Sequence, residues 1–146
     1  MTKKGIVFIK SFEKLKLKAY KCQAGVWTIG YGHTQGVYQG QEITREEAER
    51  LFSSDIAKFE MGVRNLTVGV NLSDIQIDAL VSLAFNIGLS AFKGSTLLKK
   101  IKANPNDREV ISEEWKKWRL VNGRVSNGLV RRRAEEIDMY FSGGVE

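Results

Sequence analysis

Apolar positions follow a helical period at the start of the chain and a strand period shortly afterwards. Three apolar side chains recur at intervals of three within residues 5–14, a pattern that predicts an amphipathic helix ending near Glu13. Residues 26–33 alternate with a period of two and follow the turn-forming Gln23-Ala24-Gly25. This second pattern predicts a β-hairpin within residues 19–34.

Beyond Thr34 the pattern is helical to the end of the chain. Thr44 with Glu47, and Ser73 with Gln76, each have the spacing of a capping box, in which two side chains satisfy the free N–H groups at a helix start. The helix after Ser73 is apolar around much of its circumference and runs into Gly88, so it is predicted to be the buried central helix. Further helices are expected over about 94–102, 107–120 and 129–141.

A short helix, a small antiparallel sheet and a helical bundle in this order indicate an α+β class that is mostly helical. The chain has 146 residues, which is the usual size of one domain. We expect a single domain over 1–146, with a small β-containing lobe over about 13–45. The helical lobe is expected over about 60–146 together with the N-terminal helix.

Composition restricts the class of protein further. The single cysteine, Cys22, excludes an internal disulfide. The apolar run at residues 6–9 is shorter than a membrane span or a signal-peptide core, so we expect no export signal and no membrane anchor. The net charge of +6 favours anionic partners, and nucleic acid and the acidic bacterial cell wall both qualify.

Reactive side chains gather around the predicted hairpin, where Glu13, Cys22, Thr28 and His33 lie close in sequence. A carboxyl group at the C-terminal end of a helix faces the negative end of the helix dipole, so Glu13 is expected to hold its proton tightly. Gly30, with Gly32, leaves one side of the strand without bulk, where a ligand or another backbone can approach. The residues alone leave open whether this group is catalytic or incidental.

The spacing of Glu13, Cys22 and Thr28, with eight and then five intervening residues, is similar to the catalytic motif of a known family. Blocks at 17–20 and 25–34 surround the motif, and others follow at 47–55, 84–88, 91–98 and 128–135. On these blocks, from about Phe12 to Tyr140, the chain resembles the phage lysozymes, the endolysin muramidases of glycoside hydrolase family 24. Several ordered blocks are far more specific than a three-residue motif.

The resemblance implies a lysozyme-like fold and a glycoside hydrolase. Its substrate would be bacterial peptidoglycan, cut at the β-1,4 bonds between N-acetylmuramic acid and N-acetylglucosamine. Glu13 would be the catalytic acid, and Thr28 would help to hold the attacking water. Cys22 departs from the commoner Asp, which leaves three roles open: a thiolate in place of the carboxylate, a thiol that places water, or a bystander.

The resemblance also implies roles for residues outside the motif. His33 is expected to pair with Asp55 on the following helix, and Arg133 is expected near Glu13. Phe85 and Asn86 are expected to support the site or bind substrate, with Phe85 a core residue first. A lone histidine without partners at ligand spacing argues against a metal, and we expect no cofactor.

Two rival functions remain at this point. A lytic transglycosylase would cut the same bond with a lone Glu and close an anhydro ring on the sugar. A non-catalytic protein that binds the cell wall or nucleic acid would fit the basic charge, but no DNA-reading motif is recognisable, so no nucleic-acid partner is expected.

The family resemblance also carries expectations about partners and location. It implies a monomer without stable membrane association, whose partner is the glycan strand of peptidoglycan. The protein would accumulate in the host cytoplasm without a signal peptide and act on the periplasmic wall after the membrane is permeabilised. The resemblance is also compatible with a functional dependence on a holin.

Overall fold

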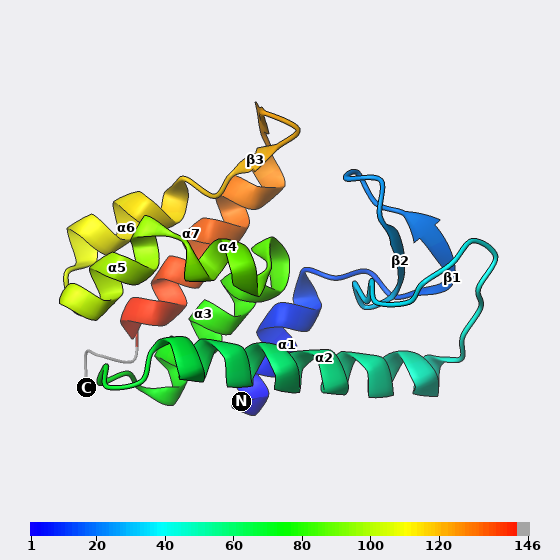
Figure 1. The fold of residues 1–146 in the computed structure, drawn as a ribbon, viewed down its shortest axis with the longest axis horizontal. Helices are drawn as coiled ribbons and strands as arrows, with labels where there is room; N and C mark the ends of the chain where they lie inside the picture. Colours follow the sequence, from blue (N-terminus) through cyan, green and yellow to red (C-terminus); the bar gives the residue numbers. More distant parts are fainter. Residues whose placement is uncertain (143–146) are drawn as a thin grey trace.

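The computed structural model describes residues 1–142, which contain seven helices and two hairpins (Figure 1). Residues 143–146, the end of the predicted helical lobe, lie outside this range. The helices are α1 (Lys3–Ser11), α2 (Arg45–Leu66), α3 (Asp74–Ile87), α4 (Leu89–Lys93), α5 (Thr96–Ala103), α6 (Arg108–Lys116) and α7 (Asn127–Ser142). The strands are β1 (Lys16–Lys21), β2 (Trp27–Gly30), β3 (Leu120–Val121) and β4 (Arg124–Val125).

The first hairpin and the helices α3 to α7 lie at opposite ends of the molecule, and α2 runs along both (Figure 1). Strands β1 and β2 pair antiparallel, with Tyr20 opposite Thr28, which confirms the predicted hairpin. The Thr44 hydroxyl accepts a hydrogen bond from the Glu47 N–H, and the Glu47 carboxylate accepts one from the Thr44 N–H. This capping box fixes the start of α2 beside the hairpin, as predicted.

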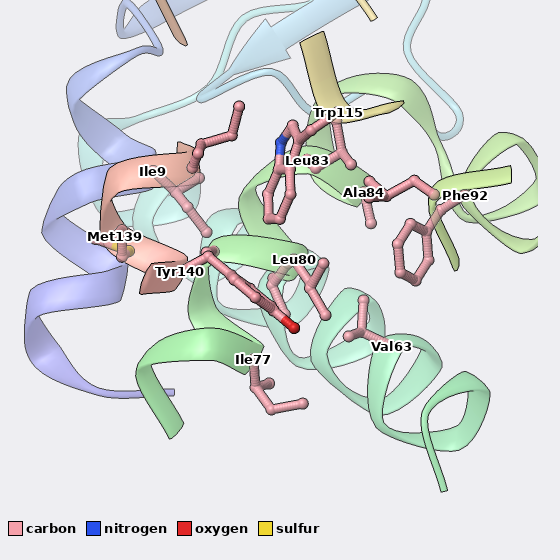
Figure 2. Close-up of a cluster of buried hydrophobic side chains, with 14 of the residues drawn as sticks. Ile9, Val63, Ile77, Leu80, Leu83, Ala84, Phe92, Trp115, Met139 and Tyr140 are labelled. Atoms are coloured by element: carbon pink, nitrogen blue, oxygen red, sulfur yellow. The ribbon is translucent and has the colours of Figure 1, made fainter. Parts of the chain in front are cut away.

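Helix α3 is the central helix of the core, as its continuous apolar pattern predicts. It also begins with the predicted capping box at Ser73, and nine consecutive residues from Gln76 are buried. Figure 2 shows Leu80, Leu83 and Ala84 of α3 among side chains of the surrounding helices, including Trp115 of α6 and Tyr140 of α7. A solid core of this kind holds α1 and α7 in place, and both border the candidate site.

The helix predicted over about 107–120 is shorter in the structure than the sequence pattern indicated. The expected helix over about 107–120 ends at Lys116, and the chain then forms the β3–β4 hairpin, which projects from the helical lobe (Figure 1). Asn122 and Gly123 have φ values of +51° and +79°. Two central residues with positive φ match a tight hairpin turn, for which Asn-Gly is the preferred pair. The sequence reading of Asn122-Gly123 as a break between helices missed these two strands.

Helix α1 ends at Ser11 with Phe12 as its C-cap, so it ends near Glu13, as predicted, and Glu13 lies just beyond it. The helix expected over about 94–102 is α5, and a separate short helix, α4, precedes it. The Ser95 hydroxyl caps α5 by accepting a hydrogen bond from the Leu98 N–H at 3.1 Å, and this marks the true start of that helix.

Candidate active site

Glu13 lies where two adjoining cavities meet, one of about 580 Å³ on the side of α2 and one of about 1060 Å³ on the side of the β3–β4 hairpin. We call the first the α2-side cavity and the second the α7-side cavity, and together they form the cleft. The residues that line both are Glu13, Tyr20, Cys22, Asn86 and Ile87. The cleft therefore passes Glu13 on both sides, as a site for a long chain-like ligand requires.

The Glu13 carboxyl group is largely removed from water. Its backbone N–H donates to the Lys10 carbonyl at 3.1 Å, which fixes the residue against the last turn of α1. Burial raises the pKa of Glu13, and this effect outweighs the opposing influence of the Arg132 guanidinium, whose Nη1 is 3.9 Å from Oε2. Glu13 therefore keeps its proton to higher pH than an exposed glutamate, in the direction expected from the sequence.

Gly32 forms the surface against which this carboxyl group rests. A Cβ atom on Gly32 would stand 2.5 Å from Oε1 of Glu13, and the backbone there has a φ of +78°. Gly30 has a different place from the one expected, because its free face meets Ala48 and Ile43 rather than the cleft. The absence of a side chain therefore lets α2 pack closely at Gly30 and lets the Glu13 carboxyl group pack closely at Gly32.

Cys22 and Thr28 face the α2-side cavity from the hairpin, together with Glu13. The Cys22 N–H donates to the Val26 carbonyl at 3.0 Å, and the Gly25 N–H donates to the Cys22 carbonyl at 2.9 Å. These bonds close the turn and hold the partly exposed thiol at its base. The structure thus brings the three motif residues to one cavity.

The Cys22 thiol has a lowered pKa. Partial burial acts to raise the pKa, but hydrogen bonds from the backbone at Val26 and Ala24 and from the Thr28 hydroxyl lower it further than burial raises it. The Thr28 hydroxyl also donates to the Val26 carbonyl at 3.0 Å. Because it has a single proton, it can donate a hydrogen bond to either the carbonyl or the sulfur, but not to both at once. A lowered pKa increases the thiolate fraction near neutral pH.

His33 and Asp55 pair as predicted, with Nδ1 of the imidazole 2.7 Å from Oδ2 of the carboxylate. The other ring nitrogen, Nε2, lies 2.9 Å from the Gln35 carbonyl. The pair joins the chain after β2 to α2, and both side chains line the α2-side cavity. Because the two side chains are only 13% and 14% exposed, the pair also stiffens this wall of the cleft.

The arginine beside Glu13 is Arg132, whereas the sequence resemblance predicted Arg133. Arg133 is fully buried and turns away from Glu13, and its Nη1 donates to Oδ1 of Asn86 at 2.9 Å and to the Trp118 carbonyl at 3.2 Å. Successive helical residues point about 100° apart, so the helix phase decides which arginine faces the cleft. Three arginines in a row cannot reveal that phase.

Phe85 and Asn86 lie at the end of α3 where it meets the cleft. The Phe85 ring packs on those of Phe59 and Phe52 at centroid distances of 5.3 and 5.9 Å, so it joins the core to the α2-side cavity. Asn86 lines both cavities. Gly32, expected from the sequence only as an open strand position, lies against Glu13, and Tyr20, which stood in a family block without an assigned role, lines both cavities.

Comparison with known proteins shows the family of the chain. The family model for phage lysozyme matches residues 10–136. The chain is 44% identical to the endolysin of Acyrthosiphon pisum secondary endosymbiont phage 1, over 97% of this chain and 98% of that protein. It is 43% identical to the endolysin of Bacillus phage B103 over 95% of this chain, but it spans only 53% of that protein.

A solved structure has the same fold. The endolysin from Escherichia coli O157:H7 phage FAHEc1 has a TM-score of 0.81 and 37% identity, covering 97% of this chain and 93% of that one. Fold and cleft together define a lysozyme-type glycosidase. The chain belongs to the phage lysozyme family, and its function is that of a phage endolysin of the muramidase type. The fold class and family expected from the sequence are confirmed.

Proposed function

We propose that the chain hydrolyses the β-1,4 bond between N-acetylmuramic acid and N-acetylglucosamine in peptidoglycan, with Glu13 as the general acid. The observation that carries the proposal is the partly buried Glu13 carboxyl group at the junction of the two cavities, with a pKa raised by that burial. A protonated carboxyl group delivers its proton to the departing glycosidic oxygen as the sugar ring becomes oxocarbenium-like.

Cys22 and Thr28 serve the other side of the reaction in this proposal. A thiolate at Cys22 is a negative charge in the cavity where the cationic sugar ring develops, and the Thr28 hydroxyl is placed to orient water. The attacking water adds its oxygen to the anomeric carbon while the glycosidic bond breaks, and its proton passes to the thiolate or to solvent. The lowered pKa of Cys22 increases the share of thiolate and in this way supports the role.

The proposed path of the glycan strand runs through both cavities and past Glu13. Phe85 offers an apolar surface on the α2 side, and the Asn86 side chain offers an amide group at the junction. Sugars bind to such mixtures of ring surface and amide because their faces are apolar and their edges carry hydroxyl groups. His33 and Asp55 act here by supporting the wall, and Gly30 by packing the hairpin on α2.

A lytic transglycosylase is the rival that the missing aspartate favours, and the reaction products separate the two. Purified peptidoglycan is digested with the protein, and the released muropeptides are measured by mass spectrometry. Hydrolysis leaves a reducing end on every N-acetylmuramic acid at a cut. If the muropeptides instead carry 1,6-anhydro ends throughout, the proposed hydrolysis is wrong and the protein is a lytic transglycosylase.

We also propose that the chain acts as one catalytic domain over 1–146, as a monomer, on the periplasmic wall after the host membrane is permeabilised. The basic charge of +6 supports an anionic wall polymer as partner. Among residues 1–142, none of the helices combines the length and apolar character needed to cross a bilayer. Lysis that requires co-expression of a holin would support this route, and light scattering of the purified protein tests the monomer.

A further inference from the structure

A buried carboxylate, Glu136 of α7, collects hydrogen bonds from four side chains in the helical lobe. It accepts from Ser82 Oγ at 2.5 Å and from Trp115 Nε1 at 3.1 Å. It also accepts from Arg132 Nε at 3.2 Å and from Arg133 Nη2 at 3.1 Å. Glu136 is completely shielded from solvent, and the two arginines are 4% and 0% exposed.

Buried ion pairs are weak evidence for stability in general, because replacing them by well-packed hydrophobic residues is often neutral or stabilising. Breaking such a group by removing one partner is costly, since it leaves an uncompensated charge. The cluster therefore holds its two guanidinium groups in fixed positions. Each guanidinium group also has nitrogens that do not bond to Glu136, and the contacts of these nitrogens show which part of the cleft the arginine serves.

Arg132 extends from Glu136 to the catalytic acid. Its Nη2 donates to the Ser82 carbonyl at 3.1 Å, and its guanidinium group lies over the Phe12 ring at 4.6 Å from the ring centroid. Its Nη1 is 3.9 Å from Oε2 of Glu13. Arg132 is bonded on its other sides, and its contact with Glu13 is longer than a hydrogen bond, so its charge lowers the pKa of the carboxyl group less than burial raises it.

Arg133 extends from Glu136 to the floor of the cleft. Its Nη1 donates to Oδ1 of Asn86 at 2.9 Å and to the Trp118 carbonyl at 3.2 Å. Because the oxygen of the Asn86 amide is engaged behind it, the NH₂ group is left for the cleft. Asn86 lines both cavities, and Trp118 lines the α7-side cavity.

We propose that Glu136 is a positioning residue of the active site, which holds Arg132 beside Glu13 and Arg133 behind Asn86. The inference rests on the proposed function of Glu13. One buried carboxylate thereby sets the distance of a cation from the catalytic acid and the direction of an amide at the cleft junction. Glu136 itself touches neither cavity.

The charged groups around Glu13 determine what the loss of Glu136 does. Glu13 lies beside Arg132 from α7, and it shares both cavities with Tyr20 from β1 and Cys22 from the turn after β1. Only Arg132 among them bonds to Glu136. The other titratable side chains that line the two cavities are His33, Asp55 and Lys58 on the α2 side and Lys14, Lys117 and Arg131 on the α7 side. Loss of the Glu136 charge leaves the Arg132 cation uncompensated, so ionised Glu13 becomes more favourable.

The test is a pH profile of peptidoglycan hydrolysis for Glu136→Gln, which keeps the shape of the side chain and removes its charge. The alkaline limb of the profile reports loss of the acid proton from Glu13. We expect this limb to move to lower pH and activity at neutral pH to fall about tenfold to a hundredfold, because small displacements in an active site have effects of this size. The matched control is Tyr140→Phe, which removes a buried hydroxyl of α7 that donates to the Pro105 carbonyl but keeps the ring that packs on Trp115. It should lower the melting temperature and leave the limb in place.

An unshifted limb in folded Glu136→Gln would overturn the inference. Where that variant does not fold, Arg132→Lys decides, because lysine keeps the charge but cannot reach Glu136, Ser82 and Glu13 together. For Arg132→Lys, a fall in kcat with little change in KM, together with a shifted alkaline limb of the pH profile, would support the positioning role. A pH profile equal to that of the parent protein would overturn it. Full activity in Glu13→Gln would instead remove the proposed function itself, so the two failures are distinguishable.

Discussion

Gly32 lies directly against the carboxyl group of Glu13, since a Cβ atom at position 32 would stand 2.5 Å from Oε1. No side chain of ordinary size fits between them. The atom in the way is the end of a flexible side chain, so the carboxyl group would move aside while the hairpin kept its fold. The absence of a side chain at Gly32 therefore lets the acid keep its partly buried position.

Gly32→Ala should reduce peptidoglycan hydrolysis by about a hundredfold, because the methyl group displaces the reacting carboxyl group by a large part of an ångström or more. Its φ of +78° adds a backbone penalty of about 1–2 kcal/mol in stability. Gly36→Ala is the matched control, because Gly36 has a φ of +71° and no atom within 4 Å of an added Cβ. Activities are compared at equal folded fraction, and equal activity in the two variants would contradict the role of Gly32.

Cys22→Ser tests the thiolate, because a serine hydroxyl does not ionise near neutral pH. We expect turnover on purified peptidoglycan to fall by about tenfold or more, in line with the loss of an acid–base group. Cys22→Asp should retain turnover, since it restores an anion at the same place. Unchanged turnover in Cys22→Ser would show that the sulfur acts as a neutral group or as a bystander.

Glu13 should lower the stability of the folded protein at neutral pH. Burial raises its pKa above the ordinary value of 4.5, so the folded state binds the proton more tightly than the unfolded chain. Stability then falls as pH rises from about that ordinary value through the raised one. We expect Glu13→Gln to melt at a higher temperature than the parent protein at pH 7, with a smaller gain at pH 4. A gain that is equal at both pH values would contradict this linkage.

The His33–Asp55 pair should contribute to stability through direct coupling. A double-mutant cycle with His33→Gln and Asp55→Asn, measured by urea unfolding, should give a coupling free energy of about 1–2 kcal/mol. The pair of Lys117 and Glu114, in which the lysine is 65% exposed, is the matched control and should give less than about 0.5 kcal/mol. Additive effects of the two substitutions would show that the 2.7 Å contact between His33 and Asp55 does not contribute to the free energy of unfolding.

The helices and the motif were predictable because their signals are local. The capping boxes at Thr44 and Ser73 and the alternation around Thr28 depend on residues within one turn or one strand, and each was found where it was predicted. The spacing of Glu13, Cys22 and Thr28 gave the motif, and the hairpin then brings these residues to one cavity.

The arrangement behind the motif was not predictable because it depends on long-range packing. Whether Arg132 or Arg133 faces Glu13 follows from the rotation of α7 against α3, for which three consecutive arginines give no signal. Glu136 stands beside exposed Glu135 in the sequence, and only the packed helices distinguish a buried carboxylate from a solvated one. The β3–β4 hairpin was missed because two-residue strands are too short to show a period.

The account depends most on Glu13 as the proton donor. The most direct measurement is the loss of turbidity of permeabilised Gram-negative cells with the parent protein and with Glu13→Gln at equal concentration. Glutamine keeps the size of the side chain and cannot deliver a proton, so the rate should fall by about 10²–10⁴-fold while the protein stays folded. Equal rates of lysis by the two proteins would contradict the account.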